Sequence, residues 1–350
     1  MAGNSGGRLF YADLLRIAAT FAVMVVHISG AWISEVPVDS AAWNILNLYD
    51  GLAHWCVPIF IMLSGMFLLD PQRELTLRTL FRRHILRIVV ALVVWSLVYS
   101  LATSFLATRT LTVESFSAAV RNLVWGKLHY HLWFLPMILG LYLVTPILRG
   151  FVRGATAREL QWYFLLVLIV TMLLHTVLAL RPSKTVSSWL TQLDIRVVLS
   201  YAGYFVLGYC LKTCVLSPAM ERLIYLLGIG GAVWSVLGTV WLSHIAGARF
   251  TFYNYNTPNV ALMSAAVFLL FRRIFQNRKA NRWVTGLSSI TFGMYLCHDL
   301  FLQVLRGLGV TTLSFSPVLS VPLLSLVVFV CSALLAWLLS KLPLVGRLIT

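Results

Sequence analysis

The sequence is poor in charged residues, and acidic residues are the scarcest of them. Only 11% of its 350 residues are charged, with 11 acidic against 27 basic, whereas 60% are hydrophobic. A soluble domain does not hide so large an apolar fraction from water, so the composition excludes an ordinary soluble protein. No polar stretch runs much beyond about 25 residues, which is too short for an independent soluble core. We therefore expect an integral membrane protein with one polytopic domain over residues 1–350.

Cysteines are also few, and several catalytic signatures are missing. The five cysteines are odd in number and lie in or near apolar segments, so we interpret them as small buried hydrophobic residues and not as a disulfide framework. The sequence contains no Walker phosphate loop, no nucleophile elbow and no HExxH zinc motif. The run "GIGG" at residues 228–231 lies in an apolar segment with no preceding strand, and it predicts helix packing.

Ten apolar stretches predict transmembrane helices, each of which needs about 17 to 25 residues to cross a bilayer. The sixth, eighth and ninth of these stretches are shorter than the others. The expected fold is therefore all-α and polytopic. The predicted spans are residues 9–30, 52–69, 85–106, 132–148, 162–180, 197–211, 223–242, 260–271, 290–304 and 319–339.

The placement of the basic residues explains the net charge of +16. With both termini in the cytoplasm, every basic cluster falls on the cytoplasmic side, as the positive-inside rule requires. This pattern favours a membrane orientation signal over a nucleic-acid-binding surface. The clusters are Arg73 to Arg87, Arg149 to Arg158, Lys212 with Arg222, Arg272 to Arg282, and Lys341 with Arg347.

Four polar segments fall on the other side, and we expect them to form a cap. They are residues 29–51, 107–129, 181–196 and 244–259. Within them, residues 112–128 have apolar positions at helical spacing and predict an amphipathic helix at the interface. The cap is also rich in aromatic residues that can stack on sugar rings or lie in the aromatic belt of the membrane. These are Trp32, Trp43, Tyr49, Trp189, Phe252, Tyr253 and Tyr255.

The first apolar segment contains "LLRIAATFAVMVVH", which begins near Arg16 and ends at His27. Ionisable residues inside a bilayer are costly unless they face protein or water, so both are candidate functional residues. Eleven residues make about three helical turns, which places the two side chains on one face, roughly 16 Å apart. Asp13 shares this face, and a structural salt bridge between Asp13 and Arg16 is the alternative interpretation.

Three further segments carry candidate residues. Ser64 follows a proline-containing run, where it serves either a site or helix packing. His129, Tyr130, His131 and Trp133 lie at the outer edge of the fourth span, where membrane anchoring is the alternative. We expect no metal there, because no carboxylate or cysteine lies at a supporting spacing.

The third of these segments is the predicted ninth span. His298 and Asp299 lie in the middle of this apolar span, where ionisable side chains are costly unless they point into the protein, so both are candidate site residues. The alternative is that His298 is a hydrogen-bonded core residue.

Together these segments resemble the acyltransferase-3 family of bacterial membrane O-acyltransferases. The most specific feature is an arginine followed eleven residues later by a histidine in the first helix. The runs "VPIFIMLSGMFL" and "HYHLWFLPMILGLYLVTPIL" are similar to the second and fourth helices of the family, and "FGMYLCHDLFL" to the ninth. The last two are most similar to the branch that includes the enterobacterial common antigen O-acetyltransferase.

The resemblance implies an enzyme of the bacterial inner membrane that transfers an acyl group, usually acetyl, from cytoplasmic acetyl-CoA. The implied acceptor is a hydroxyl of a glycan or of an undecaprenyl-linked saccharide on the outer side. Acetyl-CoA is then a substrate and not a resident cofactor. The essential arginine and histidine of the family correspond to Arg16 and His27. Neither the acceptor sugar nor the oligomeric state follows from the resemblance.

A mechanism consistent with these residues places cations at the cytoplasmic end. Guanidinium groups pair well with phosphate, so Arg82, Arg83, Arg87, Arg272 and Arg273 are candidates for holding the nucleotide of the acyl donor.

Deeper in the membrane, Arg16 would grip a phosphate or a pantetheine carbonyl. At the outer end, His27 would act as general base. Ser64, Tyr130 or His131 would stabilise the oxyanion. An acetyl-histidine intermediate is the alternative chemistry.

A second function class also fits the intramembrane ionisable residues. In a proton-coupled transporter, Asp13, His27, His298 and Asp299 would form a proton relay. A transporter would not consume acetyl-CoA. The absence of an internal repeat in the sequence weakens this alternative.

Overall fold

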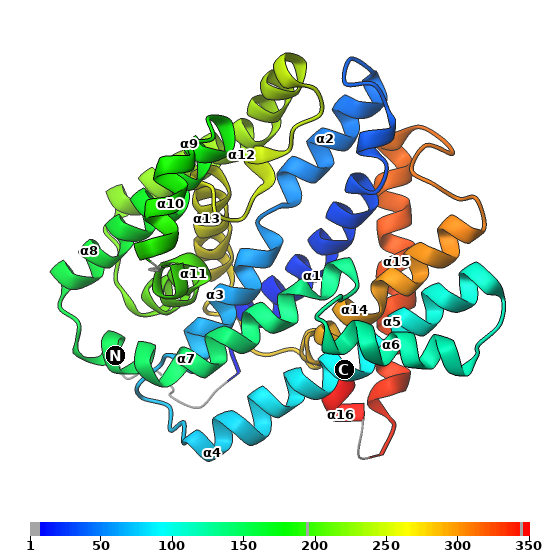
Figure 1. Ribbon diagram of the computed structural model, residues 1–350. Coiled ribbons are helices and arrows are strands. Elements are labelled where there is room, and N and C mark those ends of the chain that lie inside the picture. Colours follow the sequence, from blue (N-terminus) through cyan, green and yellow to red (C-terminus); the bar gives the residue numbers. More distant parts are fainter. Residues whose placement is uncertain (1–7, 194–195, 344–345) are drawn as a thin grey trace.

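The computed structural model describes residues 8–193, 196–343 and 346–350, and this part of the chain is helical without strands (Figure 1). The longer helices are α1 (Phe10–Gly30), α2 (Ala41–Ala53), α3 (Cys56–Leu68), α5 (Leu86–Thr108), α6 (Val113–Val124), α7 (Phe134–Gly154), α8 (Ala157–Leu166), α10 (Lys184–Leu193), α11 (Arg196–Thr213), α12 (Pro218–Ala246), α13 (Pro258–Phe275), α14 (Arg282–Gly307) and α15 (Pro317–Ser340). The short helices are α4 (Leu77–Thr79), α9 (Leu174–Leu180) and α16 (Gly346–Ile349).

Eight helical segments of the described chain are long and apolar enough to cross a membrane. They contain α1, α2 with α3, α4 with α5, α7, α8 with α9, α12, α13 and α15. The predicted spans at residues 197–211 and 290–304 form α11 and α14, which fall outside that set. The all-α polytopic fold is confirmed. The count of ten spans and the cytoplasmic position of both termini stay predictions.

Several helices begin where local chemistry favours a start. The hydroxyls of Ser40, Thr112 and Ser217 each accept a backbone N–H of the first turn that follows. Pro218 then occupies the first helical position, where its missing N–H costs nothing. Cap residues of this kind place the start of α2, α6 and α12 at the residue that follows each hydroxyl.

The second half of the predicted cap segment 29–51 is helical, because residues 41–53 form α2, which is continued by α3 in one candidate span. Asn47 and Asp50 interrupt the apolar run in the sequence, but both are buried inside the protein. Trp43 is fully buried, and Phe252 and Tyr253 of another predicted cap segment are buried as well. These three rings are therefore not available to stack on a sugar.

Glycine permits the closest helix contacts. A Cβ atom at Gly65 of α3 would overlap the carbonyl oxygen of Phe205 in α11, and one at Gly208 would overlap that of Met62. The "GIGG" run is confirmed as a packing element, because Gly228 and Gly231 face α13 at similarly short range. Small residues at such crossings let helix backbones approach closely.

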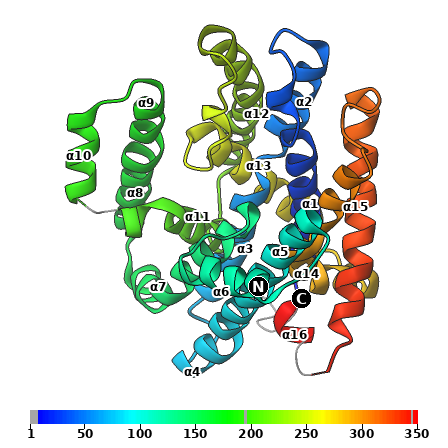
Figure 2. The same ribbon diagram turned by 45° about the vertical axis from the view of Figure 1, so that its right-hand side comes forward.

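The predicted amphipathic helix is confirmed as α6, which packs against α5. Its apolar side chains Val113, Phe116, Val120 and Val124 are exposed along one stripe, as an interfacial helix requires. Helices α8, α9 and α10 lie at one edge of the molecule, and α15 lies at the other (Figure 2). Helix α1 lies between them and packs against α2, α3, α13, α14 and α15.

The loop after α3 is tied to two other helices. The Asp70 carboxylate accepts a hydrogen bond from Lys212 of α11 at 2.6 Å and one from the backbone N–H of Gln72 at 3.0 Å. Arg149 of α7 donates to the carbonyl oxygens of Leu68 and Asp70, both at 2.8 Å. Burial alone raises the pKa of Asp70. The hydrogen bonds from Lys212 and Gln72 and the charge of Lys212 outweigh burial, so the pKa of Asp70 lies below the ordinary value.

Candidate active site

Arg16 and His27 lie on one face of the uninterrupted helix α1. The helical rise therefore separates them by roughly 16 Å along the axis, as the sequence predicts. Arg16 lies in the half of α1 nearer the first turn, and His27 lies in its last turn. The two side chains are thus directed to different depths of the same helix bundle, and each has its own cavity.

Asp13 and Arg16 form the predicted salt bridge, with 3.7 Å between Arg16 Nη1 and Asp13 Oδ1. The Ser288 hydroxyl of α14 donates to Asp13 at 2.7 Å and accepts from Arg16 at 3.2 Å. Arg8 also pairs with Asp13, at 2.7 Å. The buried carboxylate of Asp13 thus anchors α1 to α14, while the Arg16 side chain stays 30% exposed.

The exposed part of Arg16 faces a cavity of about 400 Å³, which we call the arginine cavity. Arg83, in the π-helical segment Leu80–Ile85, and Arg87, at the start of α5, also line it, so three guanidinium groups face one space. Arg87 donates to the backbone oxygen of Thr350, yet its buried Nε has no partner in the described part of the chain. The remaining polar lining residues are Ser64, His84, Tyr142, Ser288, Ser289, Thr291 and Tyr295.

Three of the predicted donor-binding arginines lie elsewhere. Arg272 and Arg273 line a separate cavity of about 160 Å³. Arg272 donates to the carbonyl oxygen of Leu211, and Arg273 pairs with Glu221 at 2.6 Å. Arg82 is exposed and does not line the arginine cavity. Basic clusters on one side of a membrane look alike in sequence, and only the helix packing separates these three from Arg83 and Arg87.

At the other end of the site, three side chains surround the His27 ring. The ring centroids of His298, Tyr130 and His131 lie 4.9, 5.3 and 6.4 Å from that of His27. His27 and His131 both line a small cavity of about 30 Å³, which we call the histidine cavity. Its other walls include Cys56, Trp133 and Tyr255.

His298 has a defined tautomer. Its Nδ1 lies 2.5 Å from the carbonyl oxygen of Tyr295, and because a carbonyl only accepts, Nδ1 carries the proton. In the neutral ring Nε2 is then a bare acceptor. This atom is buried and has no hydrogen-bond partner in the part of the chain that the structure describes.

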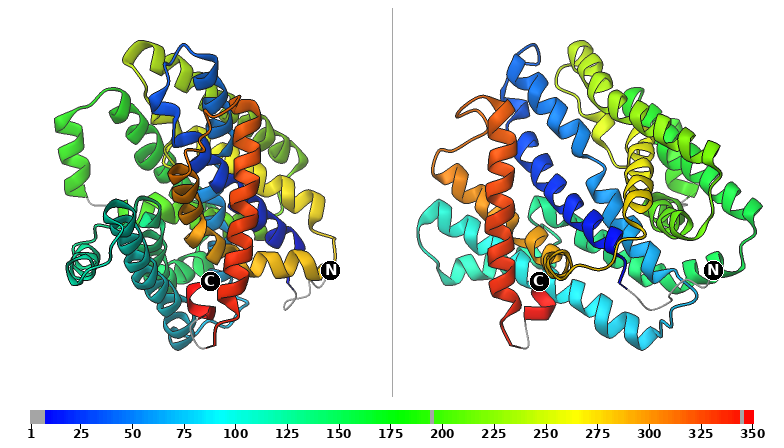
Figure 3. Two further views of the ribbon diagram at one scale, coloured as in Figure 1. Left: turned by 90° about the vertical axis from the view of Figure 1, so that its right-hand side faces the viewer. Right: turned by 180° about the vertical axis from the view of Figure 1, so that it is seen from behind.

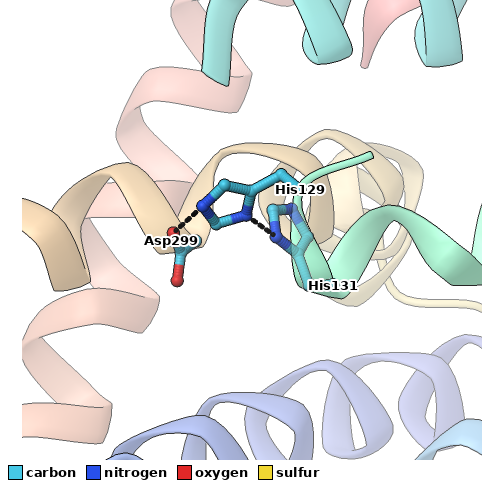
Figure 4. A group of neighbouring side chains, drawn as sticks. All are labelled: His129, His131 and Asp299. Carbon is cyan, nitrogen blue, oxygen red and sulfur yellow. Dashed lines mark hydrogen bonds and ion pairs between the residues drawn. The ribbon is translucent and has the colours of Figure 1, made fainter. Parts of the chain in front are cut away.

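His129 and His131 are joined to a carboxylate that the sequence separates widely from them. His129 lies between the other two residues, with its ring nitrogens 3.0 Å from His131 Nδ1 and 3.4 Å from Asp299 Oδ2 (Figure 4). Tyr130 and Gln303 also donate to Asp299, at 2.5 and 2.9 Å. The prediction that no carboxylate supports the histidine pair is therefore wrong, because Asp299, which is distant in the sequence, lies beside His129.

The same three residues present ligand atoms within 4.8 Å of one another. However, the two nitrogens of His129 point in opposite directions, toward His131 and toward Asp299 (Figure 4). The group is therefore arranged as a hydrogen-bonded chain and not around one central point, which a metal ion requires. That the site uses no metal stays a prediction.

The arginine cavity and the histidine cavity share part of their lining. Val23, Val57, Phe134 and Tyr295 border both, so these four side chains form a constriction between them. Sequence reasoning missed all four as site residues. Tyr295 precedes His298 by three residues on one helix, and this spacing is the only local signal that places it near the site.

The chain matches the family model described as "Acyltransferase domain" over residues 9–340. It belongs to the acyltransferase-3 family. This membership identifies the protein as a membrane acyltransferase in general terms. It does not identify the branch of the family suggested above. No curated protein and no solved structure matches the chain.

Proposed function

We propose that this acyltransferase moves an acetyl group from cytoplasmic acetyl-CoA to a hydroxyl of a glycan or undecaprenyl-linked saccharide on the outer side of a bacterial inner membrane. One observation carries the proposal. Three arginines face one cavity, His27 faces another, and four side chains border both cavities. Such an arrangement suits a donor and an acceptor that approach from opposite sides of a membrane.

The arginine cavity supports an anionic donor. Guanidinium groups bind phosphate oxygens through paired, charge-assisted hydrogen bonds. Arg16, Arg83 and Arg87 can offer such contacts, and the unpartnered Nε of Arg87 leaves one donor free. The nucleotide of acetyl-CoA would bind at the mouth, and the thin pantetheine arm would pass the constriction when Val57 and Phe134 move aside.

His27 is the proposed general base. A saccharide hydroxyl is too weak an acid to attack a thioester unaided, so a neutral imidazole must take its proton. The alkoxide then attacks the thioester carbonyl, and the C–S bond breaks. The CoA thiolate leaves and receives the proton from the His27 imidazolium, so the proton balance closes. Attack by His27 itself, with an acetyl-histidine intermediate, remains the alternative route.

Among the predicted oxyanion donors, His131 fits best. Ser64 lies at the arginine cavity and donates its hydroxyl to the Phe60 carbonyl oxygen at 2.9 Å. Tyr130 already donates to Asp299. His131 lines the histidine cavity together with His27. We propose His131 as the side chain closest to the developing charge.

The size of the histidine cavity supports acetyl as the acyl group. About 30 Å³ is room for roughly two water molecules, which is close to the three heavy atoms of an acetyl group. Trp133 and Tyr255 stack on each other at the wall of this cavity, with centroids 5.8 Å apart. Trp133 also packs against Tyr201, and Tyr255 against His54, so these rings form an aromatic wall of the cavity.

The transporter alternative has less support. It needs Asp13, His27, His298 and Asp299 in one relay, but Asp13 pairs with Arg8, Arg16 and Ser288 at the other end of α1. The four residues therefore do not form one chain of contacts. A proton relay requires continuous hydrogen-bond neighbours.

The deciding experiment measures transfer of labelled acetyl and release of free CoA in membranes that carry matched amounts of the wild type, Arg16→Ala or His27→Ala. We expect label in an extractable glycan with the wild type and a loss of about 10² to 10⁴ in rate for His27→Ala. Absence of acetyl-CoA consumption by the wild type, with a native glycan pool present, would contradict the proposal.

A further inference from the structure

A third cavity lies on the outside of the bundle, between the first turns of α14 and the second half of α15. It measures about 880 Å³. One wall consists of Phe329, Val330, Ala333 and Leu334, and the side chains of Val330 and Leu334 are 48% and 58% exposed. Helix α15 is a candidate membrane span, and it lies in front of the other helices in the left view of Figure 3. This apolar wall therefore faces the hydrocarbon of the bilayer and not water.

One end of the same groove is basic. Arg282 and Lys341 line it, each beside a tryptophan. The Arg282 guanidinium lies 5.1 Å from the ring centre of Trp283, and the Lys341 ammonium lies 5.3 Å from that of Trp337. Neither cation pairs with a carboxylate within the described residues. Aromatic rings hold a cation in place without cancelling its charge.

We propose that this groove binds one anionic phospholipid of the cytoplasmic leaflet. Its phosphate would lie between Arg282 and Lys341, and an acyl chain would lie along Val330 and Leu334. Basic residues beside a span attract anionic headgroups, and tryptophans occupy the same interfacial level. A zwitterionic lipid has no net charge to offer, so the two unpaired cations favour an anionic one.

The groove shares a wall with the arginine cavity. Ser289 of α14 lines both spaces. Its neighbour Ser288 is bonded to Asp13 and Arg16. A lipid in the groove would thus support the helix that holds Arg16 in place. The binding itself does not depend on the proposed reaction, and it can be tested without an acyl acceptor.

The test uses the purified full-length protein in a neutral detergent. Native mass spectrometry and thermal stability are measured with phosphatidylglycerol and, separately, with phosphatidylcholine. We expect phosphatidylglycerol to bind more tightly and to raise the melting temperature. The double variant Arg282→Gln/Lys341→Gln should weaken the binding of phosphatidylglycerol about 25-fold, from roughly fivefold for each cation. Arg153→Gln/Arg158→Gln, which removes two exposed cations outside the groove, is the matched control.

A second variant tests the apolar half of the groove. Gly286 lines it, and a Cβ atom at that position meets nothing within 4 Å, so Gly286→Leu fills the groove without a clash inside the protein. We expect Gly286→Leu to weaken the binding of phosphatidylglycerol although both cations remain. Gly150→Leu is the control, since Gly150 is a helical glycine with equally open surroundings outside the groove.

Three results would overturn the proposal. Equal affinity of the wild type for the two phospholipids would remove the anionic preference. If the double variant still preferred phosphatidylglycerol to phosphatidylcholine as strongly as the wild type, the headgroup would be bound by cations other than Arg282 and Lys341. Competition by glycerol phosphate at the concentration of the lipid would show that the groove binds a soluble phosphate, because the acyl chains would then contribute nothing.

Discussion

The imidazole rings of His27 and His298 lie with their centroids 4.9 Å apart and their planes tilted by 31°. His27 lines the histidine cavity, whereas His298 does not, so His298 lies behind His27 as seen from that cavity. Nε2 of His298 is a bare, buried acceptor on the ring next to His27, so His298 can orient the His27 imidazole. A catalytic base is often oriented in this way by a third group.

We expect His298→Ala to lower kcat about 10- to 100-fold with little change in KM for acetyl-CoA, because a base held in the wrong tautomer loses rate and not donor affinity. His298→Gln should recover part of the loss, since its amide oxygen reaches the place of Nε2. Steady-state acetyl transfer at matched protein level checks both variants. Equal losses in the two, together with reduced melting temperature, would show that His298 only supports the fold.

A smaller side chain at the constriction should widen the range of acyl groups. Val57 borders both cavities, and Val57→Ala removes two methyl groups from the passage. We expect the wild type to use butyryl-CoA at least tenfold less well than acetyl-CoA, since two extra methylenes overpack a cavity of about 30 Å³. Val57→Ala should reduce this ratio severalfold. Val120→Ala, on the exposed stripe of α6, should leave it unchanged.

The donor site can be tested with two arginines that look equivalent in sequence. Arg83→Gln should raise KM for acetyl-CoA about tenfold, because it removes a charged hydrogen-bond donor from the arginine cavity. Arg273→Gln should leave KM unchanged, because Arg273 lies in another cavity and pairs with Glu221. The measurement is CoA release against acetyl-CoA concentration. The reverse order of effects would move the donor site to α13.

Gly65→Ala should destabilise the protein by about 1 to 3 kcal/mol, because the new methyl group would force α3 away from the Phe205 carbonyl of α11. Thermal unfolding in detergent, followed by loss of helical circular dichroism, measures the change. Gly150→Ala is the control, since a Cβ there meets nothing within 4 Å and alanine favours the helix. A Gly65→Ala variant as stable as the wild type would mean that the crossing adjusts freely.

Stability should also fall in acid through Asp70. The folded state lowers the pKa of this carboxyl below its unfolded value of about 3.9, so its contribution is complete above that pH and is lost as the pH falls through the folded pKa. We expect Asp70→Asn to be less stable than the wild type at pH 6 and to lose less stability as the pH falls below about 4. Glu74→Gln, an exposed neighbour, should follow the wild type.

The apolar runs by themselves determined the all-α membrane fold, because a helix is the structure in which one segment satisfies its own backbone groups in lipid. They also placed Arg16 and His27 on one face, since helical spacing is a local property. The packing role of "GIGG" and the amphipathic helix at residues 112–128 follow from the same kind of local pattern.

Only the tertiary structure decided what lies next to what. Helix packing brought Asp299 to His129, placed Arg83 but not Arg273 beside Arg16, and buried Trp43 inside a segment that reads as a polar loop. The four side chains between the two cavities come from α1, α3, α7 and α14. No periodicity within one helix carries that information, because contacts between helices depend on shape and crossing angle and not on the order of residues along any single helix.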